Sequence, residues 1–315
     1  MIQVLREALR LRRLRVGVAL VALAGFLAVG GVGVERYAMN YWVYRGFSPP
    51  RDASYATQHG TEQQITVRSA ALGGRRQQVI VYLPPGYAAT TRRYPVLYLL
   101  HGFPGKPAAF LDTVRMGTVE DDLVALHEAQ PLILVMPFGS TGEFTDEEWA
   151  NGVSPGSQWA TFVWRDVVRA VDARYRTIPT PTARAIGGLS EGGYGAINIA
   201  LYHPQEFGLV ESWSGYERPD KIRSVFGASL GLLPRNDPMT MLPHVARELR
   251  ALHSYFWMYS GRSDGLKFQN RTFARELTRL HVAHHYFEAA GGHNWALWRK
   301  EAEAAYLAAA RRLHG

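Results

Sequence analysis

Hydrophobic positions fall into two unlike patterns along the 315-residue chain. Residues 16–34 are an unbroken run of Val, Gly, Ala, Leu and Phe. From residue 61 onward, short apolar runs alternate with stretches in which apolar residues recur every three or four positions. The continuous run predicts a single apolar helix, whereas the alternation predicts a globular domain of mixed helices and strands.

The apolar run at 16–34 has the length and the flanks of a membrane-spanning helix. Its nineteen residues, at about 1.5 Å each, reach about 28 Å, which is close to the hydrocarbon thickness of a bilayer. Arginines crowd residues 1–15, and an aromatic group follows the run, as at a membrane interface: Tyr37, Tyr41, Trp42 and Tyr44. By the positive-inside rule we expect residues 1–15 in the cytoplasm and the chain beyond residue 35 outside it.

A cleaved signal peptide is the alternative interpretation of this segment. Signal peptides have shorter apolar stretches that end in small residues, and Gly30, Gly31 and Gly33 supply such residues. Cleavage would release a secreted protein, whereas an uncleaved segment would leave a single-pass protein of the cell membrane. Under both interpretations the rest of the chain is extracytoplasmic.

The chain beyond this run is predicted to be a linker followed by one large domain. Residues 35–60 lack periodicity and contain Pro49 and Pro50, which predicts a juxtamembrane linker. Strand-like segments on either side of Gly73 and Gly74 predict a β-hairpin. Beyond the hairpin, apolar runs at 94–100, 132–137, 182–187, 208–213, 254–259 and 284–289 alternate with helical stretches that include 161–175, 194–203, 267–280 and 296–313. Because buried parallel strands are continuously apolar, we predict an α/β-hydrolase fold over residues 61–315, with a mostly parallel central sheet and helices on both faces.

A G-x-S-x-G motif at 188–192 marks Ser190 as the candidate nucleophile. The motif works where a strand, a sharp turn and a closely crossing helix follow one another, so small residues must flank the serine. Ser190 has glycines on both sides. A second match at 261–265 contains Ser263, but the bulky residues Leu266, Lys267 and Phe268 follow it. We therefore assign the motif to Ser190.

The partners of the serine follow from chain order. A serine hydroxyl becomes nucleophilic when an imidazole accepts its proton and a carboxylate orients that imidazole. In this fold the acid and then the histidine follow the serine. After Ser190, only Asp264 directly follows a strand-like run, whereas Asp220 and Asp237 lie in Pro-containing segments and are predicted turn or cap residues. His293 follows the last predicted strand and precedes the last helix, which is the position of the base.

The tetrahedral intermediate of acyl transfer needs N–H donors directed at its oxygen. We expect one from the backbone N–H of Glu191, directly after the nucleophile. The other is expected from the loop 101–105, where Phe103 is the candidate because Pro104 has no N–H. His101 in the same loop is predicted to be a structural residue.

Several motifs together resemble one known family. They are Tyr98-Leu99-Leu100-His101-Gly102, Asp172-Ala173-Arg174-Tyr175-Arg176, Gly188-Leu189-Ser190-Glu191-Gly192-Gly193-Tyr194-Gly195-Ala196, His203-Pro204 with Phe207, and Gly291-Gly292-His293-Asn294-Trp295 with Trp298. The set resembles the putative-esterase (esterase D-like) family, which includes S-formylglutathione hydrolases, feruloyl and acetyl-xylan esterases and secreted mycolyltransferases.

The resemblance covers roughly residues 61–313. It implies an α/β-hydrolase fold, no metal or organic cofactor, and acyl transfer through a serine ester. Position by position, it implies a nucleophile, acid and base with two oxyanion donors: Ser190, Asp264, His293, Phe103 and Glu191. Glu191 stands where Met or Gln is frequent in the family, and Asn294 where Asp is frequent. These departures argue against copying a substrate from a relative.

The composition of the chain excludes several classes of function. The chain has no cysteine, which excludes disulfides, thiolate nucleophiles and Cys-ligated zinc. Its formal charge of +8 is partly N-terminal, and without a basic stripe or a nucleic-acid motif it predicts no nucleic-acid partner. We therefore expect a membrane-anchored extracytoplasmic serine esterase that acts on a small-molecule, lipid or glycan ester. The alternatives are an acyltransferase with the same catalytic residues and an inactive envelope-binding protein.

Substrate contacts have only a faint signature in the sequence. Trp149, Trp213 and Trp295 are candidates for an acyl pocket, although aromatic residues of this kind more often pack in a core. The acidic residues 146–148, together with Glu191, would place negative charge near the site and favour a cationic ester. A solvated acidic loop is the alternative interpretation.

Overall fold

The computed structural model describes the backbone of residues 2–314 and the side chains of residues 14, 16–38 and 40–314. Contacts divide the chain into two units, with the boundary in the sequence between Pro49 and Pro50. The arginines predicted to orient the N-terminus lie outside the described side chains: Arg6, Arg10, Arg12, Arg13 and Arg15.

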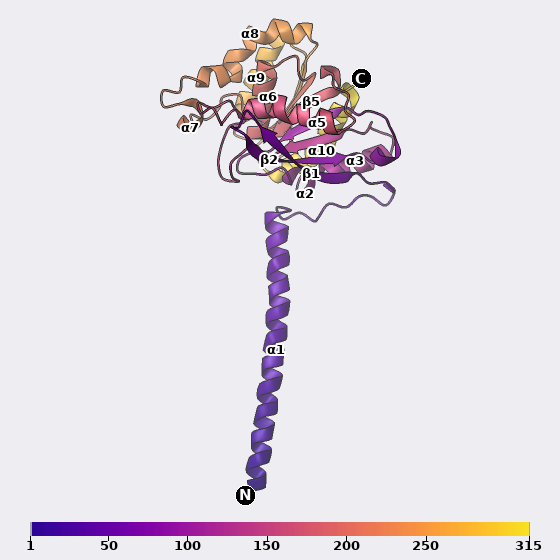
Figure 1. Ribbon diagram of the computed structural model, residues 1–315, viewed down its shortest axis with the longest axis vertical. Helices are drawn as coiled ribbons and strands as arrows, with labels where there is room; N and C mark the ends of the chain where they lie inside the picture. Colours follow the sequence, from indigo (N-terminus) through magenta and orange to yellow (C-terminus); the bar gives the residue numbers. More distant parts are fainter. Residues whose placement is uncertain (1, 315) are drawn as a thin grey trace. The chain divides into compact units, whose positions relative to one another are not determined.

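The first unit consists mainly of one long helix, α1 (Ile2–Trp42), drawn in indigo and violet in Figure 1. The helix extends beyond the predicted run 16–34 at both ends, because the flanking residues 2–15 and 35–42 contain neither glycine nor proline. After the helix, the N–H of Gly46, at a φ of 85°, donates to the carbonyl of Asn40. An 18-residue window within Val16–Trp42 has a mean hydropathy of 2.2 and is unburied. By length and composition this stretch is a candidate membrane span, and a signal sequence meets the same criteria.

The second unit is built on an eight-stranded sheet in the order β1-β2-β4-β3-β5-β6-β7-β8. The strands are β1 (Thr61–Ser69), β2 (Arg75–Leu83), β3 (Val96–Leu100), β4 (Ile133–Pro137), β5 (Arg184–Leu189), β6 (Leu209–Trp213), β7 (Tyr255–Gly261) and β8 (His284–Ala289). β1 and β2 form the predicted antiparallel hairpin, and β2 also pairs antiparallel with β4. All other pairings are parallel. The prediction of a mostly parallel sheet is confirmed.

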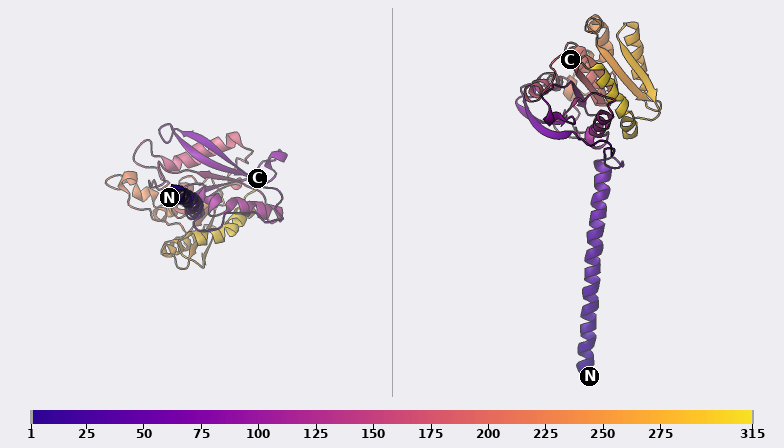
Figure 2. Two further views of the ribbon diagram at one scale, coloured as in Figure 1. Left: turned by 90° about the horizontal axis from the view of Figure 1, so that it is seen from below. Right: turned by 90° about the vertical axis from the view of Figure 1, so that its right-hand side faces the viewer.

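Helices cover both faces of this sheet, as Figures 1 and 2 show. One face packs against α5 (Val168–Arg174), α6 (Glu191–Tyr202), α8 (Pro238–Ala251) and α9 (Lys267–Arg279). The other face packs against α2 (Ala109–Asp112), α3 (Met116–Ala125) and α10 (Trp295–Arg312). The shorter helices are α4 (Trp159–Thr161), a π-helical turn (Phe162–Val167), α7 (Arg223–Phe226) and the 3-10 turns Tyr87–Ala89, Pro181–Ala183 and Leu233–Asn236. β3 to β6 are buried along their whole length, which explains their continuously apolar sequence.

Helix α8 was not among the predicted helical stretches, and it contains two prolines. Pro238 occupies the start of the helix, where a missing N–H costs nothing, and Pro243 lies inside it. The side chain of Asp237 accepts the N–H of Thr240 and so caps the helix. The predicted capping role of Asp237 is therefore confirmed.

The parallel strands determine where a site can form. Because β3, β5, β6, β7 and β8 run in the same direction, their carboxyl ends lie along one edge of the sheet. The loops that follow these strands meet at that edge, which is where open α/β sheets place their ligands.

Candidate active site

Ser190 occupies a sharp turn between β5 and α6. Its φ of 55° and ψ of −121° lie outside the ordinary helical and strand regions. A Cβ on Gly188 would lie 2.4 Å from the carbonyl oxygen of Leu100, and a Cβ on Gly192 would lie 1.8 Å from the same atom. Only glycine fits at either position, since any side chain would overlap the backbone of β3. The two glycines of the motif at Ser190 thus have a direct steric cause, whereas a Cβ on Gly265, the last glycine of the motif at Ser263, would meet no atom within 4 Å.

The side chains of Ser190, Asp264 and His293 converge although they are far apart along the chain. His293 Nε2 lies 2.9 Å from Ser190 Oγ, and His293 Nδ1 lies 2.8 Å from Asp264 Oδ2. An imidazole protonated on Nδ1 donates to the carboxylate and leaves the lone pair of Nε2 directed at the hydroxyl. Ser190 is partly exposed and His293 is exposed, so an external substrate can reach the hydroxyl.

Asp264 is held as a carboxylate by three donors. Burial alone would raise its pKa, but hydrogen bonds from His293, from Ser214 Oγ and from the N–H of Leu266 outweigh burial and lower the pKa. Ser214 Oγ lies 2.5 Å from Asp264 Oδ2, the same oxygen that accepts from the imidazole. Sequence reasoning missed Ser214, because its contact depends on β6 and β7 being neighbours in the sheet. Its position directly after a buried strand was the available signal.

The two candidate oxyanion donors come from segments that lie next to Ser190. Glu191 is the first residue of α6, so its N–H has no partner within the helix. The loop with Phe103 follows β3, and a Cβ on Gly102 would lie 3.1 Å from the Cβ of Ser190. The backbone beside Phe103 therefore lies directly against the turn that carries the serine.

His101 holds the loop after β3 in place. Its Nε2 accepts the N–H of Gly139 at 3.2 Å, and its carbonyl accepts the indole N–H of Trp149 at 2.9 Å. Burial lowers the pKa of His101 to about 4, so the ring is neutral at pH 7 and can remain a hydrogen-bond acceptor. These contacts fit the structural role predicted for His101.

Two of the three tryptophans predicted to contact a substrate have no surface with which to do so. The side chains of Trp149 and Trp213 are 0% exposed. Trp149 packs against Gly195 and Gly139, where a Cβ would overlap its ring. This burial contradicts their predicted role as substrate contacts, because their positions in the fold place them in the core. Trp295 is partly exposed and stays a candidate.

The acidic loop 146–148 does not carry the charge that its sequence indicates. Glu148 is buried, with its carboxylate accepting from Tyr216 Oη and from the N–H of Asp220. Burial raises the pKa of Glu148 to about 8. Burial also raises the pKa of Glu191 well above its ordinary value, and neighbouring acids such as Asp146 raise it further. Glu148 is therefore mainly protonated at pH 7, and Glu191 keeps its proton to a higher pH than an ordinary glutamate, which weakens the hypothesis of a cationic substrate.

One group of metal-ligating side chains lies away from this site. Asp52, His59 and Asp121 have candidate ligand atoms within 4.8 Å of one another. His59 Nδ1 lies 2.6 Å from Asp52 Oδ2, while Asp121 accepts from Tyr82 Oη and from the N–H of Gly60. These internal contacts account for the cluster without an ion.

Comparisons with known proteins identify the family. The sequence profile described as Putative esterase matches residues 69–308, a span that contains Ser190, Asp264 and His293. The chain belongs to this family. Residues 69–308 form an esterase domain, and the family indicated by the sequence motifs is confirmed.

Individual relatives resemble parts of the chain. The endo-1,4-beta-xylanase/feruloyl esterase of Xylanibacter ruminicola is 32% identical over 161 residues, which are 50% of this chain and 22% of that protein. The diacylglycerol acyltransferase/mycolyltransferase Ag85C of Mycobacterium leprae is 25% identical over 214 residues, 54% of this chain and 62% of that protein. The chain thus spans less than two thirds of each of these relatives.

The solved structure of a ferulic acid esterase matches the fold. It superposes with a TM-score of 0.72 at 24% identity, covering 81% of this chain and 100% of that one. The likeness confirms the predicted α/β-hydrolase fold.

Proposed function

We propose that this protein is a serine esterase that hydrolyses carboxylic esters through an acyl-serine intermediate. The observation that supports this most strongly is the continuous relay from Ser190 through His293 to Asp264, with contacts of 2.9 and 2.8 Å. A relay of this geometry activates a hydroxyl that is otherwise a poor nucleophile. Membership of an esterase family points to the same chemistry.

In the proposed reaction, Ser190 Oγ attacks the ester carbonyl carbon while His293 Nε2 takes the hydroxyl proton. The negative charge on the carbonyl oxygen is held by the N–H groups of Glu191 and Phe103, each contributing on the order of 3–4 kcal/mol. His293 then gives its proton to the leaving alcohol as the ester bond breaks. Water, activated by the same imidazole, releases the acid and restores Ser190. Asp264 orients the ring and stabilises its charged form.

We further propose that α1 keeps the esterase domain on the extracytoplasmic side of a cell membrane. The support is the apolar stretch Val16–Trp42, with arginines before it and aromatic residues at its end. An enzyme retained there would act on esters of envelope lipids or glycans. Cleavage of the segment would release the same domain.

Transfer to an alcohol is the second candidate function, favoured by the similarity to the mycolyltransferase. The acyl-serine would form in the same way, and a sugar or lipid alcohol would replace water in the second step. Analysis of the products formed from one ester in the presence of both acceptors separates the two outcomes.

Turnover of p-nitrophenyl esters by the full chain in detergent tests the proposal. Ser190→Ala should abolish turnover while the protein stays folded by circular dichroism. Ser263→Ala is the matched control, because it removes the exposed serine of the second G-x-S-x-G motif and should leave turnover unchanged. A fully active Ser190→Ala variant would refute the assignment. A folded wild-type protein that hydrolyses no ester would favour an inactive binding protein.

A further inference from the structure

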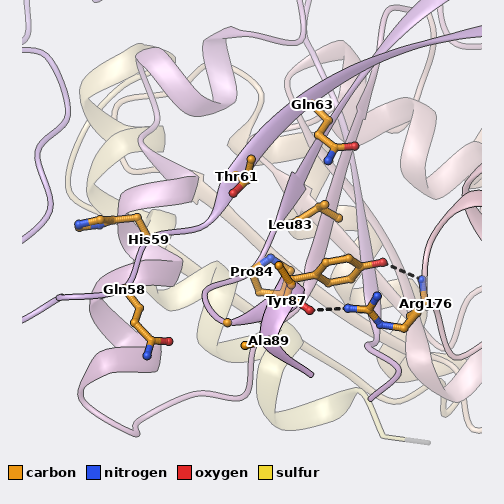
Figure 3. Close-up of a pocket in the computed structure, with 11 residues that line it drawn as sticks. Gln58, His59, Thr61, Gln63, Leu83, Pro84, Tyr87, Ala89 and Arg176 are labelled. Carbon is orange, nitrogen blue, oxygen red and sulfur yellow. Dashed lines mark hydrogen bonds between the residues drawn. The ribbon is translucent and has the colours of Figure 1, made fainter. Parts of the chain in front are cut away.

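A pocket of about 670 Å³ lies at the edge of the sheet opposite to Ser190. It is lined by residues around the start of β1 and the end of β2, including Thr61, Gln63 and Leu83, and by Tyr87 and Arg176 (Figure 3). The backbone of Arg176 bonds to Tyr94, just before the amino end of β3, whereas the active-site loop follows the carboxyl end of that strand. The pocket is therefore separate from the esterase site.

Arg176 is fixed in this pocket but not neutralised. Its guanidinium lies 3.8 Å from the centre of the Tyr87 ring, and it donates to the carbonyls of Tyr87 and Arg92. The N–H of Arg176 also donates to Tyr87 Oη, so the two residues hold each other in place (Figure 3). No ion pair in the described part of the chain includes Arg176. A guanidinium held by neutral carbonyls keeps its full charge for an external anion.

Arg92 and Arg93 lie close to Arg176, although neither lines the pocket. The guanidinium of Arg92 lies 4.6 Å from the ring centre of Tyr94, and Arg93 donates to the carbonyl of Thr177. Neither arginine belongs to an ion pair among the residues with described side chains. At the opposite rim, His59 lies beside the carboxyl group of Asp52, which disfavours a second anionic group of a ligand there. The pocket thus suits a ligand with its anionic group at one end.

The middle of the pocket is neutral and mixed in character. Gln63 Oε1 accepts from Tyr175 Oη at 3.1 Å, which leaves the amide NH₂ of Gln63 as a donor for a ligand. Thr61 adds a hydroxyl, and Leu83 and Pro84 add apolar surface. This volume is within the range of small-molecule sites, and a lone inorganic anion would fill a small part of it. Alternating C–H faces and hydroxyls, as in a sugar ring, match such a lining.

We propose that this pocket binds an acidic saccharide, with a carboxylate or phosphate group at Arg176 and sugar hydroxyls at Thr61 and Gln63. The site would be a second, non-catalytic binding site that holds an acidic glycan on the esterase domain. It depends on none of the residues assigned to ester hydrolysis, so the two proposals can fail separately.

Ligand titration by saturation-transfer NMR tests this proposal on the full chain in a detergent without a sugar headgroup. The probes are glucuronic acid, glucose 1-phosphate, glucose and inorganic phosphate. Both acidic sugars should bind at least about tenfold more tightly than glucose or phosphate. Phosphate binding as tightly as glucose 1-phosphate would reduce the pocket to an inorganic-anion site and overturn the proposal. Glucose binding as tightly as glucuronic acid, or no binding by any probe, would also overturn it.

Two variants test the assigned contacts. Arg176→Gln should weaken acidic-sugar binding about tenfold or more, and Gln63→Glu should do the same by repulsion while its carboxylate still accepts from Tyr175. The matched control is Arg169→Gln, at an exposed arginine that does not line the pocket. Esterase turnover should be unchanged in all three, which shows that they fold. Equal binding by wild-type and Gln63→Glu proteins, or an equal loss in the Arg169→Gln control, would contradict the assignment.

Discussion

Replacing Ser214 with alanine should slow ester hydrolysis although Ser214 touches no substrate. Its hydroxyl donates to Asp264 Oδ2 at 2.5 Å, and both side chains are buried, so water cannot replace the lost donor. A hydrogen bond to a charged group contributes about 1.5–3 kcal/mol. If the reaction barrier rises by the whole of that amount, kcat/KM falls about 10- to 150-fold.

The assay is the pH dependence of kcat/KM for a p-nitrophenyl ester. Ser214 helps to hold the pKa of Asp264 below its ordinary value, so its loss raises that pKa and moves the acid limb of the profile to higher pH. Ser212→Ala is the matched control, because Ser212 is a buried serine on β6, two residues before Ser214, and its hydroxyl has no partner among the described residues. An unchanged Ser214→Ala enzyme, or an equal loss in Ser212→Ala, would refute the reasoning.

Two other changes have defined outcomes. Gly192→Ala places a Cβ 1.8 Å from the carbonyl oxygen of Leu100, so the variant should lose about 3 kcal/mol or more of unfolding free energy, measured by urea denaturation, and its activity as well. Glu148→Gln should flatten the pH dependence of Tm. The pKa of Glu148 is raised to about 8 in the folded protein, so the wild-type protein loses stability as pH rises from about 4.5 towards 8, whereas the variant lacks this loss. Equal slopes of Tm against pH in the two proteins would contradict the buried, protonated state of Glu148.

Local sequence rules identified the turn residues and the nucleophile. Gly73 and Gly74 adopt positive φ in the predicted hairpin turn, at 64° and 83°. Gly188 and Gly192 predicted the close crossing at Ser190, because only a residue without a side chain permits that approach. The hairpin glycines reflect the backbone of the turn itself, and the glycines at Ser190 belong to a short motif, so the sequence alone carried the signal.

Features that depend on contacts between distant segments could not be predicted from the sequence. Trp149 and Trp213 have the composition of pocket residues, and only the assembled core shows that they are buried. Ser214 becomes a partner of Asp264 because β6 and β7 are adjacent. Helix α8 was not predicted, because Pro243 lies inside it and proline has a low helix propensity. Packing of α8 against the core stabilises the helix nevertheless.

The most direct test of the central assignment is to map the site at which a fluorophosphonate attaches covalently to the full-length protein. The proposed relay predicts a single adduct on Ser190 after proteolysis and mass spectrometry. Labelling should be lost in Ser190→Ala and strongly slowed in His293→Ala. An adduct on Ser263 or another residue, or a Ser190→Ala protein that labels at the wild-type rate, would contradict the account.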